Sequence, residues 1–473
     1  MESRISASQI KKNLIISILA QIISLIVSFI MNLILPKYIS EFQYAYWQTY
    51  LLYVGYVGIL HFGLLDGIVL RYSQYDYDEL DKPRIRSQFK SLLFFNHLIA
   101  MIGIVIAGIY CNAEMRIVFI MAAIGIVTRN LFTYTSYTFQ ITNRINKYAT
   151  MVISYRIFYG IVVCILLIGG VQNFFWFCLA DLCSDLFGVF VGAFFNRGLY
   201  FGSSLNLKDT VQELSLNISS GIMLMAANWS SFLLTGSARL IIQWHWDEII
   251  FGKVSFSFSI TNLFLTFVTA ISVVLFPSLK RADPDKLPEL YKQIRDGISP
   301  FLICILICYY PGCWILNKWI PVYNQSLIYL GILLPTIVFT SKVSLLTNNY
   351  LKAFRKEKKM FLINVVSVCL AISAFVVSAY VFDNLNMLLI CIVTVLMFRS
   401  IASEIEVMKI LNLHGMKDFI IEILMTIVFV FSTIQFDLWK GFMIYLFAGS
   451  IYIYFYREHM KEYFYVIIKK LRI

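Results

Sequence analysis

The chain has 473 residues, of which 59% are hydrophobic and only 14% are charged, and its formal net charge is +12. A single soluble core stops growing near about 250–300 residues, so soluble folding does not account for this much apolar sequence. The positive charge lies in short segments between apolar stretches, where membrane topology explains it without a nucleic-acid partner. The nine cysteines form no Cys-x-x-Cys pair and no metal-site spacing with the five histidines, so we expect no metal.

Fourteen apolar stretches of helical length follow one another along the chain. Each is long enough to cross about 30 Å of hydrocarbon as a helix. They are predicted at residues 13–35, 44–66, 90–110, 117–139, 149–170, 171–195, 214–236, 253–276, 297–317, 326–348, 360–382, 387–405, 419–435 and 440–456. The predicted fold class is therefore an all-α integral membrane protein with about 14 transmembrane helices.

The distribution of positive charge predicts the orientation of these helices. Of the 39 lysines and arginines, 29 fall in every second gap between the stretches and five fall in the alternate gaps. Since cytoplasmic loops are enriched in lysine and arginine, both termini are predicted to face the cytoplasm. Most tryptophans lie near the predicted outer ends, which agrees with their preference for the headgroup level. No gap is long enough for a soluble catalytic domain, which favours a transporter over an enzyme.

A weak internal repeat divides the chain. The order of helices and basic loops from Asn13 recurs from Asn217, at an offset of about 205–210 residues. We therefore predict an N-terminal lobe at 1–210 and a C-terminal lobe at 211–405, each of six helices and related by a pseudo-twofold axis along the membrane normal. Residues 406–473 add two helices and a cytoplasmic tail. Such lobes usually place a substrate site between them.

Five cations lie inside the apolar stretches or at their edge, where a charge costs at least about 2.5–3.5 kcal/mol at the helix centre. Arg129 and Arg399 lie deepest, and Arg156 and Lys342 lie towards the inner ends. Lys253 is at an outer helix end and is interpreted as interfacial. The other four are candidates to line a cationic, water-filled cavity for an anionic head group. The alternative that they form structural ion pairs is about equally weighted for each residue.

Acidic side chains in the same stretches are fewer. Asp181 and Asp185 are four residues apart and share one face of a helix, while Asp66 follows His61 near the end of the second stretch. The plain interpretation is that the carboxylates neutralise the intramembrane arginines. The functional interpretation makes Asp66, His61, Asp181 and Asp185 candidates for coupling to protons or sodium. We expect no cofactor, and coupling to H⁺ or Na⁺ stays open.

Several motifs resemble a known family. Lys12-Asn13 opens the first helix, Gly63-Leu-Leu-Asp-Gly-Ile-Val-Leu-Arg-Tyr72 closes the second, Gln140-x-x-x-Arg144-x-x-x-Tyr148 follows the fourth, and Val274-Leu-Phe-Pro-Ser-Leu-Lys280 follows the eighth. With fourteen helices in a 6+6+2 layout, this order resembles the polysaccharide transporter family. Its members are the O-antigen and lipid-linked oligosaccharide flippases of the multidrug/oligosaccharidyl-lipid/polysaccharide (MOP) superfamily.

The resemblance implies a bacterial inner-membrane flippase of lipopolysaccharide or other polysaccharide biosynthesis. It would move an undecaprenyl-pyrophosphate-linked oligosaccharide to the outer leaflet by alternating access through a cationic central cavity. Arg129 is the strongest of the four candidate cations, and we expect it to bind the pyrophosphate during transit. The partners implied are that lipid-linked substrate, membrane lipid, and a polysaccharide polymerase with its chain-length regulator. Three alternatives stay open: a multidrug/cation antiporter, a lipid II flippase of the same superfamily, and an O-antigen polymerase, which needs a large outer loop that this chain lacks.

Overall fold

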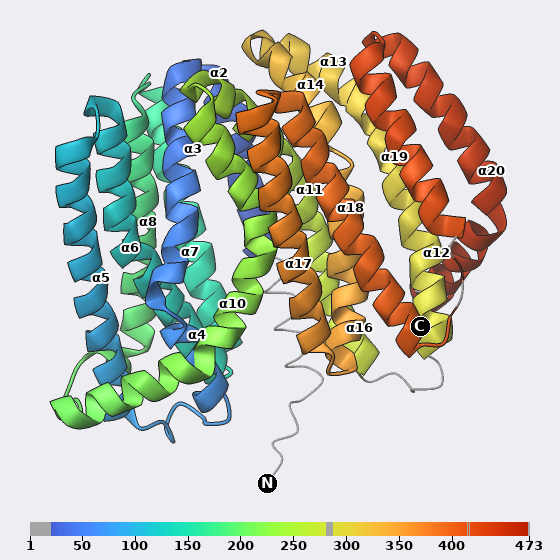
Figure 1. Ribbon diagram of the computed structural model, residues 1–473. Helices are drawn as coiled ribbons and strands as arrows, with labels where there is room; N and C mark the ends of the chain where they lie inside the picture. The colour runs from blue at the N-terminus through green and yellow to red at the C-terminus, as the bar shows by residue number, and fades with distance from the viewer. Residues whose placement is uncertain (1–19, 281–286, 414, 416, 472–473) are drawn as a thin grey trace. The chain divides into compact units, whose positions relative to one another are not determined.

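A computed structural model describes residues 20–280, 287–413, 415 and 417–471 (Figure 1). Within these residues the regular structure is helical throughout, with no β-strand. Twelve helices are long and apolar enough to span a membrane, and two further pairs of helices, each bent at a short break, bring the number to 14. The fourteen spans match the fourteen predicted stretches one to one, which confirms the predicted fold class.

The chain divides into two compact units between Trp229 and Ser230, within helix α10 (Leu207–His245). The helices of the first unit are α2 (Leu35–Tyr38), which ends the first span Ala20–Tyr38, α3 (Glu41–Tyr56), α4 (Leu64–Tyr72), α5 (Lys82–Tyr110), α6 (Ala113–Ile141), α7 (Ile145–Ile168), α8 (Phe174–Phe195) and α9 (Arg197–Tyr200). Helix α6 is central to this unit, because it packs against α3, α5, α7 and α8.

The second unit contains the rest of α10 and ten further helices. These are α11 (Glu248–Lys280), α12 (Leu287–Ile305), α13 (Tyr309–Trp319), α14 (Asn324–Leu333), α15 (Thr336–Lys342), α16 (Asn348–Ala353), α17 (Glu357–Val376), α18 (Leu385–Ile410), α19 (Lys417–Gln435) and α20 (Leu438–Leu471). Helix α18 packs against α14, α15 and α17, and α20 packs against α12, α13 and α19.

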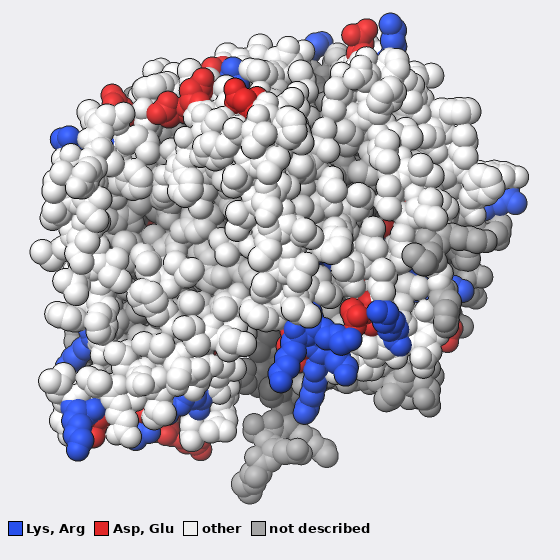
Figure 2. Space-filling model, viewed as in Figure 1, with Lys and Arg blue, Asp and Glu red and all other residues white. Residues whose placement is uncertain are grey.

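The helices carry apolar side chains on their outer surfaces as well as in their interior. Ile168, Phe190 and Phe447 are 88%, 71% and 70% exposed. Charged side chains gather at the two ends of the helices and are sparse along their middle (Figure 2). Since lipid tails are as apolar as these side chains, such a surface is stable only in a bilayer. The structure is therefore that of a multi-pass membrane protein.

The second span is broken in the first unit. Helix α3 continues as a 3₁₀ turn (Val57–His61), and α4 leaves it at an angle of 54°. Phe62 and Gly63 at the break have φ angles of 51° and 82°. Gly67 in α4 packs directly on Asn217 of α10, where a Cβ atom would collide with the backbone carbonyl. Broken helices at membrane depth are tolerated only where they are buried in protein or line a cavity.

The tenth span is broken in the second unit, where residues Pro321–Leu333 and Thr336–Ala353 meet at 43°. Pro335 precedes α15 and has no N–H to donate, so the helix bends there. Lys342 ends α15, and the next turn, Val343–Thr347, is a π-helix. A π-turn holds one extra residue and often marks a functional position.

Hydrogen bonds that cap the helices recur at about the spacing of the predicted repeat. The Ser40 side chain accepts from the backbone N–H of Gln43 at the start of α3, and Asp247 accepts from Ile250 at the start of α11, about 210 residues later. Asn173 and Asn384 cap α8 and α18 with a similar spacing. Side-chain caps are thus present at helices that the predicted repeat would pair.

Candidate functional site

Arg129 forms two salt bridges in the first unit. From α6, its Nη1 lies 2.6 Å from Asp185 Oδ1 and its Nη2 lies 2.6 Å from Asp181 Oδ2, both on α8. Tyr50 donates to Asp181 at 2.9 Å, and Thr128 donates to Asp185 at 3.3 Å. The two aspartates meet one arginine because residues four apart in a helix stack on one face. Each carboxylate therefore has a cation and a hydroxyl donor, as in a structural ion pair.

Arg156 on α7 is half-buried in the same unit. Its guanidinium lies 4.9 Å from the ring centroid of Tyr155, and among the described residues it has no hydrogen bond or salt bridge. It adds one unpaired positive charge to the first unit.

The break between α3 and α4 holds a second polar group. His61 Nε2 lies 3.8 Å from Asp66 Oδ2, and both side chains are 6% exposed. The backbone N–H of Gly63 donates to His61 Nδ1 at 3.2 Å, and Asp66 accepts a hydrogen bond from Asn228 of α10. Since Nδ1 accepts a hydrogen bond, the geometry assigns the proton of a neutral imidazole to Nε2, which faces Asp66. His61 and Asp66 therefore form one buried polar pair at the bent part of the span.

Lys342 lies at the centre of a charged cluster in the second unit. Its Nζ is 2.6 Å from Glu404 Oε2 on α18 and 2.7 Å from Glu422 Oε2 on α19. Arg295 on α12 lies 2.8 Å from the other oxygen of Glu404 and also forms a salt bridge with Asp418 on α19. The side chains of Lys342, Glu404 and Glu422 are 1%, 0% and 3% exposed. Lys342 is thus fully engaged within the protein.

Arg399 on α18 differs from the other deep cations, because its described partners are uncharged. Its Nε donates to Asn364 Oδ1 of α17 at 2.8 Å, and its Nη2 donates to Ser231 Oγ of α10 at 2.7 Å. Asn364 also donates to Ser231 at 3.3 Å, which fixes both acceptors. Arg399 is only 5% exposed, and no carboxylate among the described residues pairs with it. A guanidinium has five N–H donors, so three of them have no partner among the described residues.

The structure therefore pairs some of the predicted residues with each other or with carboxylates, and leaves others apart. Of the four candidate cations, Arg129 and Lys342 are paired with carboxylates, while Arg156 and Arg399 have no carboxylate partner in the part of the chain that the structure describes. Four partners were not among the predicted residues: Arg295, Glu404, Asp418 and Glu422. Glu404 and Glu422 lie inside or beside apolar stretches, so the rule that singled out Lys342 could have found them.

The described residues of the second unit enclose cavities. One of about 300 Å³ is apolar and is lined by α18 and α19 from Ile390 to Met397 and from Ile423 to Gln435. Another, of about 660 Å³, lies between α13, α14 and the start of α20, and includes Tyr309, Asn324 and Asp437. None of the four candidate cations lines either cavity. In the described part of the chain, no group of three or more His, Cys, Asp or Glu side chains is arranged to hold a metal ion.

No protein-family model matches the sequence, and no curated protein matches it either. Solved structures do match it. The lipid II flippase MurJ in an inward closed conformation aligns with a TM-score of 0.65 at 11% identity, over 93% of this chain and 98% of that one. The chain shares the fold of this structure.

Two further structures with this fold align over less of the chain. An inward-facing multidrug resistance MATE family transporter of the MOP superfamily has a TM-score of 0.58 at 12% identity, over 83% of this chain and 98% of that one. A MOP superfamily transporter from Pyrococcus furiosus, described by the reverse polarity of its binding pocket, has a TM-score of 0.50 at 12% identity, over 85% and 96%. At these identities the likeness concerns the fold.

Proposed function

We propose that the protein is a flippase that moves an undecaprenyl-pyrophosphate-linked oligosaccharide, the repeat unit of O-antigen or another surface polysaccharide, from the inner to the outer leaflet of a bacterial cytoplasmic membrane. Arg399 is the residue that binds the pyrophosphate during transit. The observation that carries the proposal is that this arginine is buried and that no carboxylate of the described residues pairs with it.

Arg399 lies deep within the membrane-spanning helix α18. It lies about 21 Å along α18 from Leu385 and about 16 Å from Ile410, at a rise of 1.5 Å per residue. A charge at this depth is costly and is retained mainly where it serves substrate or ion movement. The planar fork of arginine matches the oxygens of a phosphate, so its free N–H groups suit a pyrophosphate better than a lysine would.

The extent of the fold also favours a lipid-linked substrate. The lipid II flippase covers 93% of this chain, whereas the MATE transporter covers 83%. The difference fits a protein with two helices, α19 and α20, beyond a twelve-helix transporter. In the proposed mechanism the prenyl chain stays in the bilayer, and the protein replaces only the lost hydration of the head group.

The membrane potential gives the direction. It favours outward movement of an anion by about 2.3 kcal/mol per charge per 100 mV. Outward movement of a pyrophosphate with two negative charges therefore lowers the free energy without a coupled ion. His61 and Asp66 supply a second, optional element, because a buried carboxylate with no lysine or arginine partner among the described residues can exchange a proton or sodium.

The pair of His61 and Asp66 also favours the alternative function, a multidrug/cation antiporter. An antiporter would use Asp66 to bind a cation and would not need Arg399. A lipid II flippase would share the need for Arg399, and differs from our proposal only in the head group.

The test is transport by the full chain in proteoliposomes loaded with undecaprenyl-pyrophosphate oligosaccharide, measured as access of the sugar to an external enzyme. Arg399→Gln should lower the rate at least tenfold, and Arg399→Lys should restore it in part because the charge returns without the fork. The matched control is Arg156→Gln, which removes another unpaired intramembrane cation. Wild-type rates for Arg399→Gln would overturn the proposal, and efflux of cationic drugs that needs Asp66 would favour the antiporter.

A further inference from the structure

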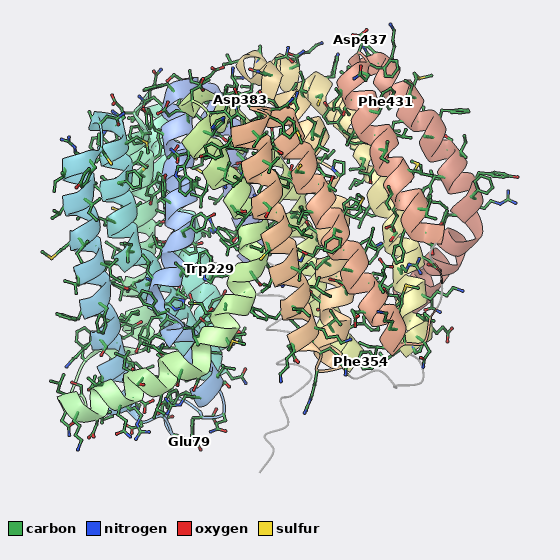
Figure 3. All side chains as sticks on the ribbon, in the orientation of Figure 1. Glu79, Trp229, Phe354, Asp383, Phe431 and Asp437 are labelled. Atoms are coloured by element: carbon green, nitrogen blue, oxygen red, sulfur yellow. The ribbon has the colours of Figure 1, made fainter. Side chains whose placement is uncertain are left out.

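The turn between α16 and α17 carries an exposed group of basic side chains. Lys352, Arg355, Lys356 and Lys358 are all exposed, and among the described residues none of the four forms a salt bridge or side-chain hydrogen bond. Lys359 is exposed too, but it is paired with Glu406 at 2.5 Å. Figure 2 shows the cluster as the densest blue group in view, and Phe354, labelled in Figure 3, marks the turn. We call Lys352, Arg355, Lys356 and Lys358 the basic turn.

The first unit has a turn with the same backbone between α6 and α7. There, the N–H of Arg144 donates to Phe139 at 2.8 Å, as the N–H of Lys356 donates to Leu351 at 2.8 Å in the basic turn. The residues before them, Asn143 and Arg355, have φ angles of 52° and 54°. The two turns are therefore equivalent positions of the internal repeat.

The basic side chains of the two turns behave differently. In the first unit, Arg144 donates to Asn196 at 2.5 Å and lies 4.4 Å from the ring centroid of Tyr77, and Lys147 lies 4.0 Å from the ring of Phe195. Both cations therefore serve contacts inside the protein. General enrichment of positive charge in cytoplasmic loops predicts cations in both turns, but it does not explain why those of the basic turn alone lack protein partners.

Arg355 adds a second argument. A left-handed residue after a helix end is usually glycine, because any Cβ is strained there. The unit-1 turn has asparagine, the next most tolerant residue, whereas the basic turn has a long charged side chain. A strained conformation that carries an exposed arginine suggests that the arginine is kept for a contact outside the chain.

We propose that the basic turn binds the phosphate head groups of anionic phospholipids in the leaflet at the predicted cytoplasmic end. Membrane-spanning α17 begins at Glu357, directly after the turn, so the side chains lie at headgroup level. Four cations with one acid among them, directly next to a membrane helix, match the pattern that attracts anionic lipid. The partner is thus a lipid surface, and the contact holds this corner of the second unit in register with the bilayer.

The experiment uses the purified full chain in nanodiscs of phosphatidylcholine with increasing phosphatidylglycerol, and measures retained phosphatidylglycerol by native mass spectrometry. Replacing all four residues of the basic turn by glutamine should weaken phosphatidylglycerol binding about tenfold or more. A variant that exchanges each Lys for Arg and Arg355 for Lys should keep it. High salt should weaken binding by the wild type, since the contact is exposed and electrostatic.

Arg355→Gly separates binding from folding. It should lower phosphatidylglycerol retention while the thermal unfolding temperature stays equal or rises, because glycine relieves the left-handed strain. The control is the double variant Lys318→Gln with Lys440→Gln, which removes two cations from the predicted outer end. It should leave phosphatidylglycerol retention unchanged.

The result that overturns the proposal is wild-type phosphatidylglycerol retention by the four-residue variant. Competition by millimolar inorganic phosphate would also overturn it, by showing a site for free phosphate, and so would retention of undecaprenyl pyrophosphate alone. The two proposals can fail separately. Arg399→Gln should lose transport and still retain phosphatidylglycerol. Loss of phosphatidylglycerol retention in the four-residue variant would leave the pyrophosphate contact of Arg399 in place.

Discussion

Replacement of Arg129 by methionine should destabilise the first unit strongly. The substitution keeps the length and apolar stem of the side chain but removes the cation that lies 2.6 Å from both Asp181 and Asp185. Two carboxylates that are 8% and 0% exposed would then face each other with only hydroxyl donors, from Tyr50 and Thr128. The loss should therefore come from the carboxylates left behind.

The size of the effect follows from the burial of the pair. Removal of one partner from a buried ion pair typically costs about 3–5 kcal/mol. Because the Arg129 side chain is 27% exposed, water screens part of the charge and the lower end applies, about 3 kcal/mol. For a unit of this size, that corresponds to a fall of about 6–12 °C in the unfolding temperature. The triple variant with Asp181→Asn and Asp185→Asn should recover to within about 1 kcal/mol, since no charge remains buried.

The assay is thermal unfolding of purified protein in detergent. Unfolding is monitored by the reaction of a thiol dye with the buried Cys178, which lies on the same helix as the two aspartates. Equal unfolding temperatures for wild type and Arg129→Met would refute the reasoning. So would a triple variant as unstable as the single one, because the loss would then come from packing and not from uncompensated charge.

Three further predictions use the same thermal assay. Arg399→Met should unfold no earlier than the wild type, since it relieves a buried charge without a carboxylate partner; a large destabilisation would show that the arginine is structural. Lys342→Met should cost about 3–5 kcal/mol, and Glu404→Gln with Glu422→Gln in the same chain should recover most of it; failure of that rescue would contradict the assignment of the ion pairs. Gly67→Ala should unfold earlier than Gly108→Ala, whose added methyl meets open space; similar values would refute the close contact between α4 and α10.

The sequence was sufficient for the order of the spans because the signal is local. About 20 apolar residues can be recognised one stretch at a time, and none of the fourteen required knowledge of a neighbour. The breaks in the second and tenth spans were not predicted. Gly63 permits a left-handed conformation, but Phe62 has no local preference for one, so the bend also depends on the packing of α4 on α10.

The pairing of charges could not be read from the sequence to the same degree. Depth in a helix made Arg129 the strongest candidate for a substrate, yet depth does not reveal whether a carboxylate lies across the interface. Arg129 and Asp185 are 56 residues apart, and Lys342 and Glu422 are 80 apart. Which helices face each other depends on the packing of the whole unit. Arg399 can be told apart from the paired cations only once its neighbouring side chains are known.

The charged cluster around Lys342 has a consequence for biosynthesis. The last of its acidic partners on α19 is 80 residues further along the chain, and synthesis at about 5–20 residues per second delivers it about 4–16 s later. During this interval the lysine cannot reach its contact with Glu422, and an isolated apolar helix that contains an unpaired lysine inserts less readily. We therefore expect the insertion machinery or a chaperone to hold the tenth span until α18 and α19 emerge. Chains cut short before residue 422 should be prime substrates for membrane proteases, however apolar the rest of their helices.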